Sequence, residues 1–190
     1  EFNKIIEGSN AIAQNAYYHL AESYVNLNKK QQALNAFRNA SEMDFNPNIQ
    51  EDAWLNYAKL SYEIGNPYKS TPEVLTDFLK RYPKSAFKIE VETLLIDSYI
   101  SSNNFKEALE LLENKSRSAH KEAYQKVAFF RALEVYNNAK YSDAKELLNR
   151  SLSTPINPIY KARATYWKAE SNYQLSNFKE ALEGFLDFKN

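Results

Sequence analysis

The chain has 190 residues, of which 44% are hydrophobic and 25% are charged, and its 24 basic residues balance its 24 acidic residues. This neutral balance argues against nucleic acid as a partner, because nucleic-acid-binding proteins need a basic surplus to displace the counterions of phosphates. The absence of cysteine excludes disulfides and thiolate metal sites, and the absence of a long apolar run argues against a direct membrane span.

Apolar residues recur along the chain at helical spacing. Ala13, Ala16, Tyr17, Leu20 and Ala21 stand at positions i, i+3, i+4, i+7 and i+8, which form one stripe of an α-helix. The chain has only three glycines, which favours long helices joined by short connections. The same pattern, followed in chain order, predicts helices over residues 10–28, 31–43, 49–64, 72–81, 85–101, 105–115, 119–138, 141–151, 157–175 and 178–188.

The segment Thr71-Pro72-Glu73 predicts how one of these helices begins. We expect Thr71 to cap the helix, Pro72 to take its first position and Glu73 to lie near the positive end of the helix dipole. We expect four further prolines to lie between repeats, where they cost no helix hydrogen bond. They are Pro47, Pro83, Pro155 and Pro158.

One heptapeptide occurs twice without change. Asn104–Glu110 recurs as Asn177–Glu183, and Lys140–Leu147 lies midway with its aromatic residue and its alanine in register. The interval corresponds to two repeats of roughly 36 residues, each an antiparallel pair of helices. The alanines that we expect at close helix contacts are Ala33, Ala108, Ala144 and Ala181.

The chain resembles the tetratricopeptide repeat family at the positions that set its helix packing. The residues that match the family pattern at the family spacing are Tyr17, Leu20, Ala21, Tyr24, Ala33, Phe37 and Ala40. The resemblance implies an all-α fold, namely a right-handed superhelical solenoid of antiparallel helix pairs with about five repeats in a single domain. The implied repeats cover residues 10–46, 47–84, 85–117, 118–155 and 156–190. We expect residues 1–9 to end a preceding repeat and the chain to be a fragment of a longer protein.

The junction Tyr82-Pro83-Lys84-Ser85 carries a second resemblance. It is similar to the repeat ending of bacterial envelope tetratricopeptide proteins, such as outer-membrane assembly lipoproteins and the Tol–Pal coordinator. This resemblance covers one repeat junction. It implies a bacterial protein in the periplasm or otherwise associated with the cell envelope, with the cytoplasm as the alternative.

The sequence offers no constellation of residues that could carry out catalysis. His19 and His120 lie in different repeats, and neither belongs to a metal-binding spacing. Gly8, Gly65 and Gly184 are isolated and cannot form a phosphate-binding loop. We therefore expect no enzyme activity, no cofactor and no metal site.

The first helices of tetratricopeptide repeats line a concave groove, and the resemblance places a set of large side chains there. The residues that we predict to contact a partner are Tyr18, Glu22, Val25, Leu55, Tyr62, Asp97, Ile100, Phe129, Leu133, Tyr136, Tyr166, Glu170 and Tyr173. Tyrosine provides a large contact area with few rotors to fix, and the acidic members favour a partner with some lysine or arginine. The groove is therefore predicted to bind a peptide or a partner protein.

Two other interpretations stay open. Three tyrosines of the groove, Tyr62, Tyr136 and Tyr173, can instead pack against the next repeat and form the wall of the superhelix. The chain can also serve as a structural spacer or a self-association module, whose exposed repeat ends contact further repeats or another copy. A scaffold that binds a partner protein is the preferred hypothesis.

Overall fold

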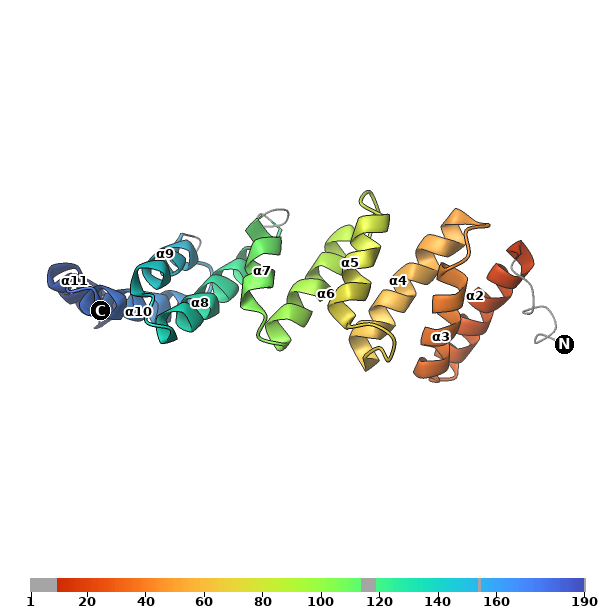
Figure 1. Ribbon diagram of the computed structural model, residues 1–190, viewed down its shortest axis with the longest axis horizontal. Helices are drawn as coiled ribbons and strands as arrows, with labels where there is room; N and C mark the ends of the chain where they lie inside the picture. The colour runs from red at the N-terminus through yellow and green to blue at the C-terminus, as the bar shows by residue number, and fades with distance from the viewer. Residues whose placement is uncertain (1–9, 114–118, 154, 190) are drawn as a thin grey trace. The chain divides into compact units, whose positions relative to one another are not determined.

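The computed structural model describes residues 10–113, 119–153 and 155–189, and every regular element among them is a helix (Figure 1). The helices are α2 (Ala11–Asn26), α3 (Lys30–Ser41), α4 (Pro47–Ile64), α5 (Thr71–Arg81), α6 (Lys88–Ser101), α7 (Phe105–Leu111), α8 (Lys121–Asn137), α9 (Tyr141–Leu152), α10 (Pro158–Gln174) and α11 (Phe178–Lys189). They form two compact units, with unit 1 ending at Ser98 and unit 2 beginning at Tyr99. Each predicted helix is present, which confirms the all-α fold. The prediction for residues 1–9 lies outside the described residues.

The predicted start of α6 is wrong by three residues. The helix begins at Lys88 rather than at residue 85. The Phe87 backbone N–H donates to the Ser85 hydroxyl oxygen at 3.2 Å, and the Lys88 N–H donates to the Ser85 carbonyl at 3.2 Å. A serine side chain that bonds the backbone locally offers the chain an alternative to the helix, so the first helical turn is delayed.

The predicted cap of α5 is also wrong, because Ser70 rather than Thr71 precedes the helix as its cap. The Glu73 carboxylate accepts the Ser70 backbone N–H at 2.9 Å and the Ser70 hydroxyl at 2.6 Å. The Thr71 hydroxyl is not available to cap the helix, since it donates to the Ser61 carbonyl at 2.9 Å. Pro72 therefore takes the second helical position, which tolerates a missing N–H as well as the first.

The same left-handed turn closes four of the helix pairs. Its residues with φ between 55° and 62° are Asn28, Asn103, Ala139 and Ser176. The next backbone N–H then reaches back five residues, as the Lys29 N–H does to the Tyr24 carbonyl at 2.8 Å. This is the longer hydrogen bond of a Schellman motif, which satisfies carbonyls left free at a helix end. The turn reverses the chain, so α3 lies beside α2, α9 beside α8 and α11 beside α10 (Figure 1).

A buried glutamine in each unit holds the start of the following first helix. The Gln14 side chain accepts the Asn46 N–H at 2.7 Å and donates to the Met43 carbonyl at 2.6 Å. The Gln125 side chain likewise accepts the Asn157 N–H at 2.7 Å and donates to the Asn157 carbonyl at 3.1 Å. Both glutamines are fully buried. The sequence analysis did not predict a role for either of them.

An asparagine–proline pair begins the helix that each glutamine holds. The side chain of Asn46 accepts backbone N–H groups at the start of α4, and that of Asn157 does the same at the start of α10. Pro47 and Pro158 then occupy the first helical turn rather than the connections between repeats, where they were expected. Proline is tolerated there because its missing N–H has no partner within the helix.

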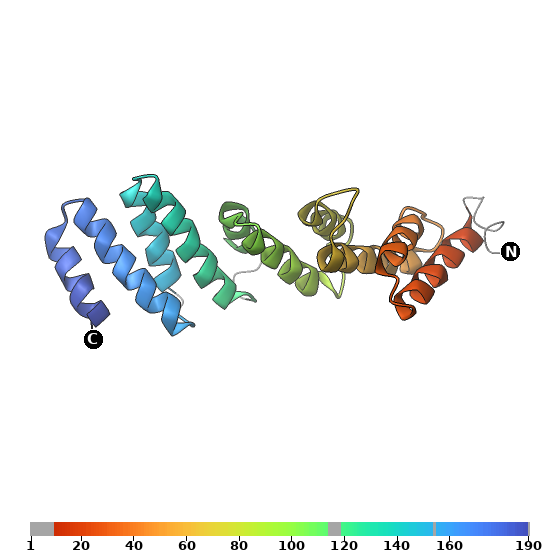
Figure 2. The same cartoon turned by 90° about the horizontal axis from the view of Figure 1, so that it is seen from below.

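The helices of unit 2 pack around small residues and aromatic rings. Helices α8 to α11, drawn in teal and blue, lie side by side (Figure 2). The core of this unit includes Phe129, Ala132 and Leu148, with Trp167 packed against it. The alanines predicted at close contacts are all buried, which confirms that part of the pattern; they are Ala33, Ala108, Ala144 and Ala181.

Replacing Gly184 by alanine should destabilise unit 2. An added Cβ would lie 2.8 Å from the Ala169 Cβ, closer than real Cβ atoms approach. We expect overpacking to cost about 1–3 kcal/mol, which exceeds the gain in helix propensity of about 1 kcal/mol, so the midpoint of urea unfolding should fall. In an Ala169→Gly background the same change should be neutral or stabilising. Equal destabilisation in both backgrounds would contradict the close contact.

Candidate partner-binding faces on the first helices

The first helix of each pair carries the residues predicted to contact a partner. These helices are α2, α4, α6, α8 and α10. The structure divides their predicted residues into four groups: side chains that bond to another first helix, side chains buried in a unit, other half-buried side chains, and exposed side chains.

Tyr18 in unit 1 is tied to the next first helix. Its hydroxyl donates to the Asp52 carboxylate of α4, which also accepts the Asn56 side-chain amide at 3.0 Å. Burial raises the pKa of Tyr18, and the neighbouring Asp52 charge raises it further. The half-buried ring also packs edge-on against Phe37, with centroids 5.8 Å apart. Tyr18 therefore joins α2, α3 and α4 and presents only part of its surface.

The remaining residues of unit 1 differ in exposure. Val25 and Tyr62 are exposed near the ends of α2 and α4, and the Asp97 side chain is exposed on α6. Glu22 is exposed as well, and its carboxylate lies 2.8 Å from His19 Nδ1. Leu55 is only 3% exposed, so the prediction that it lies on an open face is wrong.

The burial of Leu55 follows from the position of α4 in unit 1. Seven of its eighteen residues are buried, including the neighbours Trp54 and Ala58. The consecutive buried residues Ala53, Trp54 and Leu55 span a wider arc than the apolar stripe of a helix packed on one side. Helix α4 contacts α2, α3 and α5, so its covered surface extends around to Leu55.

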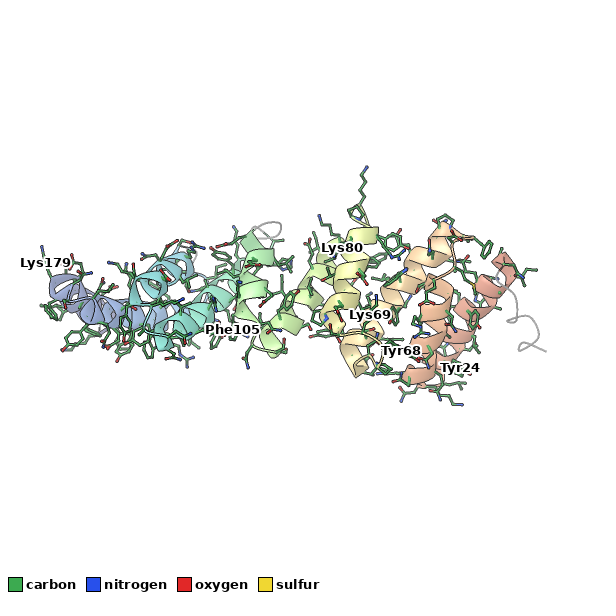
Figure 3. All side chains as sticks on the ribbon, viewed as in Figure 1. Tyr24, Tyr68, Lys69, Lys80, Phe105 and Lys179 are labelled. Atoms are coloured by element: carbon green, nitrogen blue, oxygen red, sulfur yellow. The ribbon has the colours of Figure 1, made fainter. Side chains whose placement is uncertain are left out.

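Phe129 in unit 2 is a second correction, since it is only 2% exposed. Its ring centroid lies 5.3 Å from that of Phe130 and 5.7 Å from that of Tyr160 on α10. Phe130 in turn stacks on Phe105, the residue labelled in Figure 3, with centroids 5.1 Å apart. The first helix α10 thus covers Phe129.

Tyr136 of α8 is half-buried and tied to α10. Its hydroxyl donates to Glu170 Oε1 at 3.3 Å, and its ring lies edge-on to Trp167 with centroids 5.0 Å apart. Burial, followed by the charge of Glu170, raises the pKa of Tyr136 to about 12. Gln174 also donates to Glu170 Oε1, at 3.0 Å. One oxygen of the Glu170 carboxylate therefore accepts two hydrogen bonds from uncharged neighbours, and the carboxylate keeps its negative charge.

Tyr166 and Tyr173 of α10 are the most open aromatic residues of the predicted set in unit 2. They are 36% and 54% exposed. Tyr166 packs against Phe188 of α11, with centroids 5.4 Å apart, and Tyr173 packs against Phe178 at 5.6 Å. They stand one repeat after Phe129 and Tyr136, which α10 covers. Among the described residues, α10 lies over Phe129 and Tyr136, and no helix lies in the equivalent position over Tyr166 and Tyr173.

The other two predicted residues of unit 2, Ile100 and Leu133, are half-buried. Phe178, Leu182 and Leu186 form an exposed apolar stripe on α11. The sequence analysis did not identify this stripe. Its signal is the spacing of four residues between the three side chains, which places them on one helical face. This stripe adjoins Tyr173 through Phe178.

The described residues offer little for chemistry at these faces. Within residues 10–113, 119–153 and 155–189, no three His, Asp or Glu side chains gather where they could hold a metal ion. The same residues include no helix with both the length and the apolarity needed to cross a membrane. The arrangement can offer aromatic surface and carboxylates to a partner.

Replacing Tyr136 by phenylalanine tests whether its hydroxyl joins α8 to α10. We expect a loss of about 0.5–1.5 kcal/mol in unfolding free energy at neutral pH. The fold raises this pKa, so the contribution is present below the ordinary tyrosine value of about 10 and is lost as pH rises toward about 12. Urea unfolding at several pH values measures it. The hydroxyl of Tyr173 has no partner among the described residues, so Tyr173→Phe is the control. Equal losses in both variants would contradict the assignment.

The comparisons with known proteins agree with the helix pairs described above. Family models described as tetratricopeptide repeat match residues 15–42 and 131–187. A structure of MamA AMB-1 is 20% identical and has a TM-score of 0.53, with 95% of this chain and 92% of that chain covered. YrrB, described as a TPR protein with an unusual peptide-binding site, is 19% identical with a TM-score of 0.52, covering 98% and 89% of the two chains. None of the curated proteins matches the chain. The chain thus contains tetratricopeptide repeats and has the fold of an all-α tetratricopeptide-repeat solenoid.

Proposed function

We propose that this chain is a protein-interaction scaffold that binds a peptide or a partner protein through the exposed residues of its first helices. The observation that carries the proposal is the exposure of Tyr166 and Tyr173 on α10. They stand seven residues apart, two helical turns along one face, and they adjoin the aromatic residues of α11. Such a surface offers a partner a large apolar area with polar hydroxyl groups at its edge.

The exposed residues of unit 1 supply a second, smaller surface of the same kind. Val25 and Tyr62 provide apolar area, and Glu22 and Asp97 provide negative charge. A partner segment with alternating apolar and basic residues is complementary to this composition. Leu55 and Phe129 are left out of the proposed surface because both are buried.

The fold comparison supports the proposal in one respect. YrrB, which shares the fold, is described as having a peptide-binding site. We keep a bacterial envelope location as part of the proposal, and it rests on the junction Tyr82–Ser85 alone.

The proposal is tested by selecting binding peptides from a random library against the whole chain. The affinity of a selected peptide is then measured by fluorescence anisotropy. Tyr166→Ser/Tyr173→Ser should weaken binding roughly thirtyfold, because aromatic hot spots contribute about 2 kcal/mol or more. Both side chains are exposed, so the variant should keep the thermal unfolding midpoint of the wild type to within a few degrees.

Tyr68→Ser provides the matched control. Tyr68 is an exposed tyrosine outside the first helices (Figure 3), and it donates its hydroxyl to Asn35 at 3.0 Å. Its removal should leave the affinity unchanged. If the double variant is folded and binds as tightly as the wild type, or as Tyr68→Ser, the proposed surface is wrong.

A second candidate function is a structural spacer or self-association module. The apolar stripe of Phe178, Leu182 and Leu186 on α11 favours it, because exposed apolar surface of this kind is commonly covered by another protein surface. Sedimentation velocity over a range of concentrations separates the two candidates. A sedimentation coefficient that rises with concentration and falls back in Leu182→Glu favours self-association. A constant value argues against self-association, and together with failure to select any binding peptide it favours the structural spacer.

A further inference from the structure

The heptapeptide that occurs twice in the chain begins two helices with the same residues. Asn104–Glu110 covers the cap and most of α7, and Asn177–Glu183 covers the start of α11. The alanine of each copy, Ala108 in α7 and Ala181 in α11, is buried. The side of the heptapeptide that carries this alanine is therefore packed in both copies.

The phenylalanine and the leucine of the heptapeptide differ in exposure between the two copies. Phe105 and Leu109 are only 8% and 6% exposed on α7. Phe178 and Leu182, at the same positions of α11, are each 60% exposed. Residues four apart lie on one helical face, so an identical apolar stripe is covered in the first copy and open in the second. The covered copy therefore shows what kind of surface fits the open one.

Helix α8 covers the stripe of α7. Phe130 of α8 stacks on Phe105, with ring centroids 5.1 Å apart and an angle of 14° between the ring planes. Further along the same side, the Tyr124 hydroxyl donates to Oε1 of Glu113, which follows α7, at 3.3 Å. The contacts advance along α7 while they go back along α8, so α8 runs antiparallel to the helix that it covers.

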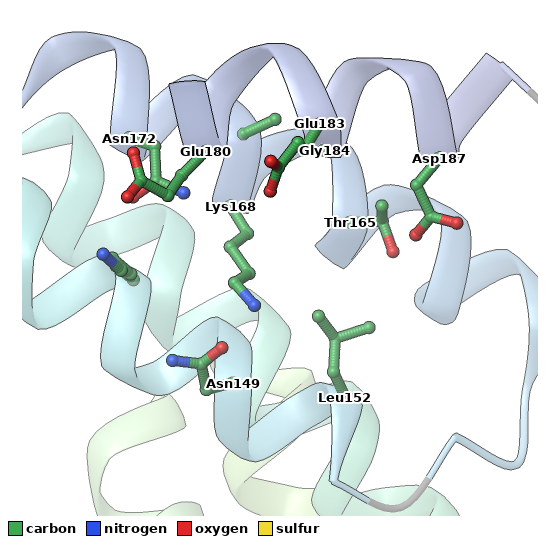
Figure 4. A pocket seen from close by; sticks show the side chains of 11 residues that line it. Asn149, Leu152, Thr165, Lys168, Asn172, Glu180, Glu183, Gly184 and Asp187 are labelled. Atoms are coloured by element: carbon green, nitrogen blue, oxygen red, sulfur yellow. The ribbon is translucent and has the colours of Figure 1, made fainter. Parts of the chain in front are cut away.

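The open stripe of α11 differs from its covered counterpart in its last residue. Leu186 stands eight residues after Phe178, as Glu113 does after Phe105. A leucine cannot accept the hydrogen bond that Glu113 accepts, so an apolar side chain suits this position better than a hydroxyl group. On another side of α11, three carboxylates line a pocket with α9 and α10 (Figure 4); they belong to Glu180, Glu183 and Asp187. The stripe itself is apolar along its whole length.

We propose that the stripe of Phe178, Leu182 and Leu186 binds an amphipathic helix of another protein, in the antiparallel arrangement in which α8 covers α7. The partner helix places an aromatic residue on Phe178, at the position that Phe130 has in α8. Six residues earlier, at the position of Tyr124, it carries an apolar residue that meets Leu186. An apolar helix face laid on an apolar surface is a common mode of peptide recognition. The inference does not rest on the proposed surface of the first helices.

Helix α2 of a second copy of this chain does not carry the required pattern. Among the described residues no helix precedes α2, so it is the first helix that a second copy could offer. Counted from the buried glutamine of each helix, α2 has Ala13 in place of Tyr124 and His19 in place of Phe130. Neither alanine nor histidine supplies the large apolar side chain that the stripe requires. The stripe therefore fits a partner helix better than a second copy.

A labelled peptide with the sequence of α8, residues 121–137, is the direct probe, because α8 covers the identical stripe within this chain. Its binding to the whole chain is measured by fluorescence anisotropy. We expect saturable binding, which Leu182→Glu should weaken roughly tenfold or more. Ile89→Glu is the matched control, since Ile89 is also 60% exposed but lies in unit 1, and it should bind the peptide like the wild type.

Two variants of the peptide test the pattern of the partner helix. Phe130→Ala in the peptide should weaken binding roughly tenfold, because it removes the aromatic contact with Phe178. Tyr124→Leu in the peptide should strengthen binding roughly threefold, because the new leucine meets Leu186 and no hydroxyl group is left without an acceptor. Equal affinities for the three peptides would contradict the proposed arrangement.

Three further results would overturn the proposal. One is the absence of saturable binding of all three peptides at high micromolar concentration. The second is equal affinity of the peptide for the wild type and for Leu182→Glu, which would place the peptide elsewhere, such as on α7 in exchange for α8. The third is a dimer of the chain that is lost in Leu182→Glu, which would identify a second copy as the occupant of the stripe.

Discussion

The hydrogen bonds of a buried glutamine to the chain that precedes a first helix organise each unit of this protein. Gln14 holds Asn46 in unit 1, and Gln125 holds Asn157 in unit 2. A buried side-chain amide needs hydrogen-bond partners for both its oxygen and its nitrogen. Both bonds can form only when the backbone before the next first helix lies in one position. The following helix then begins where the asparagine cap and the proline set it. The position of the following helix then determines which side chains of the preceding first helix are covered.

The placement of α10 explains why aromatic residues at equivalent positions of two repeats differ in solvent exposure. Helix α10 packs on Phe129 through Tyr160 and on Tyr136 through Trp167, so Phe129 is buried in the core and Tyr136 is half-buried. Their equivalents on α10 itself remain exposed. Among the described residues, the same column of side chains is therefore covered where another first helix packs on it and exposed where none does.

The periodicity of apolar residues was enough to predict every helix and the buried alanines, because both depend on the stripe of a single helix pair. It could not predict the burial of Leu55 and Phe129, which depends on helices packed from a neighbouring repeat. It also missed Gln14 and Gln125, since a polar residue on a buried stripe is recognised only from its partners.

The central claim is that each glutamine fixes the first helix that follows it. Amide hydrogen exchange of Gln14→Met and Gln125→Met, compared with the wild type, tests it most directly. Each substitution leaves backbone groups without partners at one junction, at a cost of about 1–3 kcal/mol. The account predicts faster exchange at Ile156, Asn157 and the first turn of α10 in Gln125→Met, and at Asn46 and the first turn of α4 in Gln14→Met. Unchanged protection at both junctions, or an equal increase at both in either variant, would contradict it.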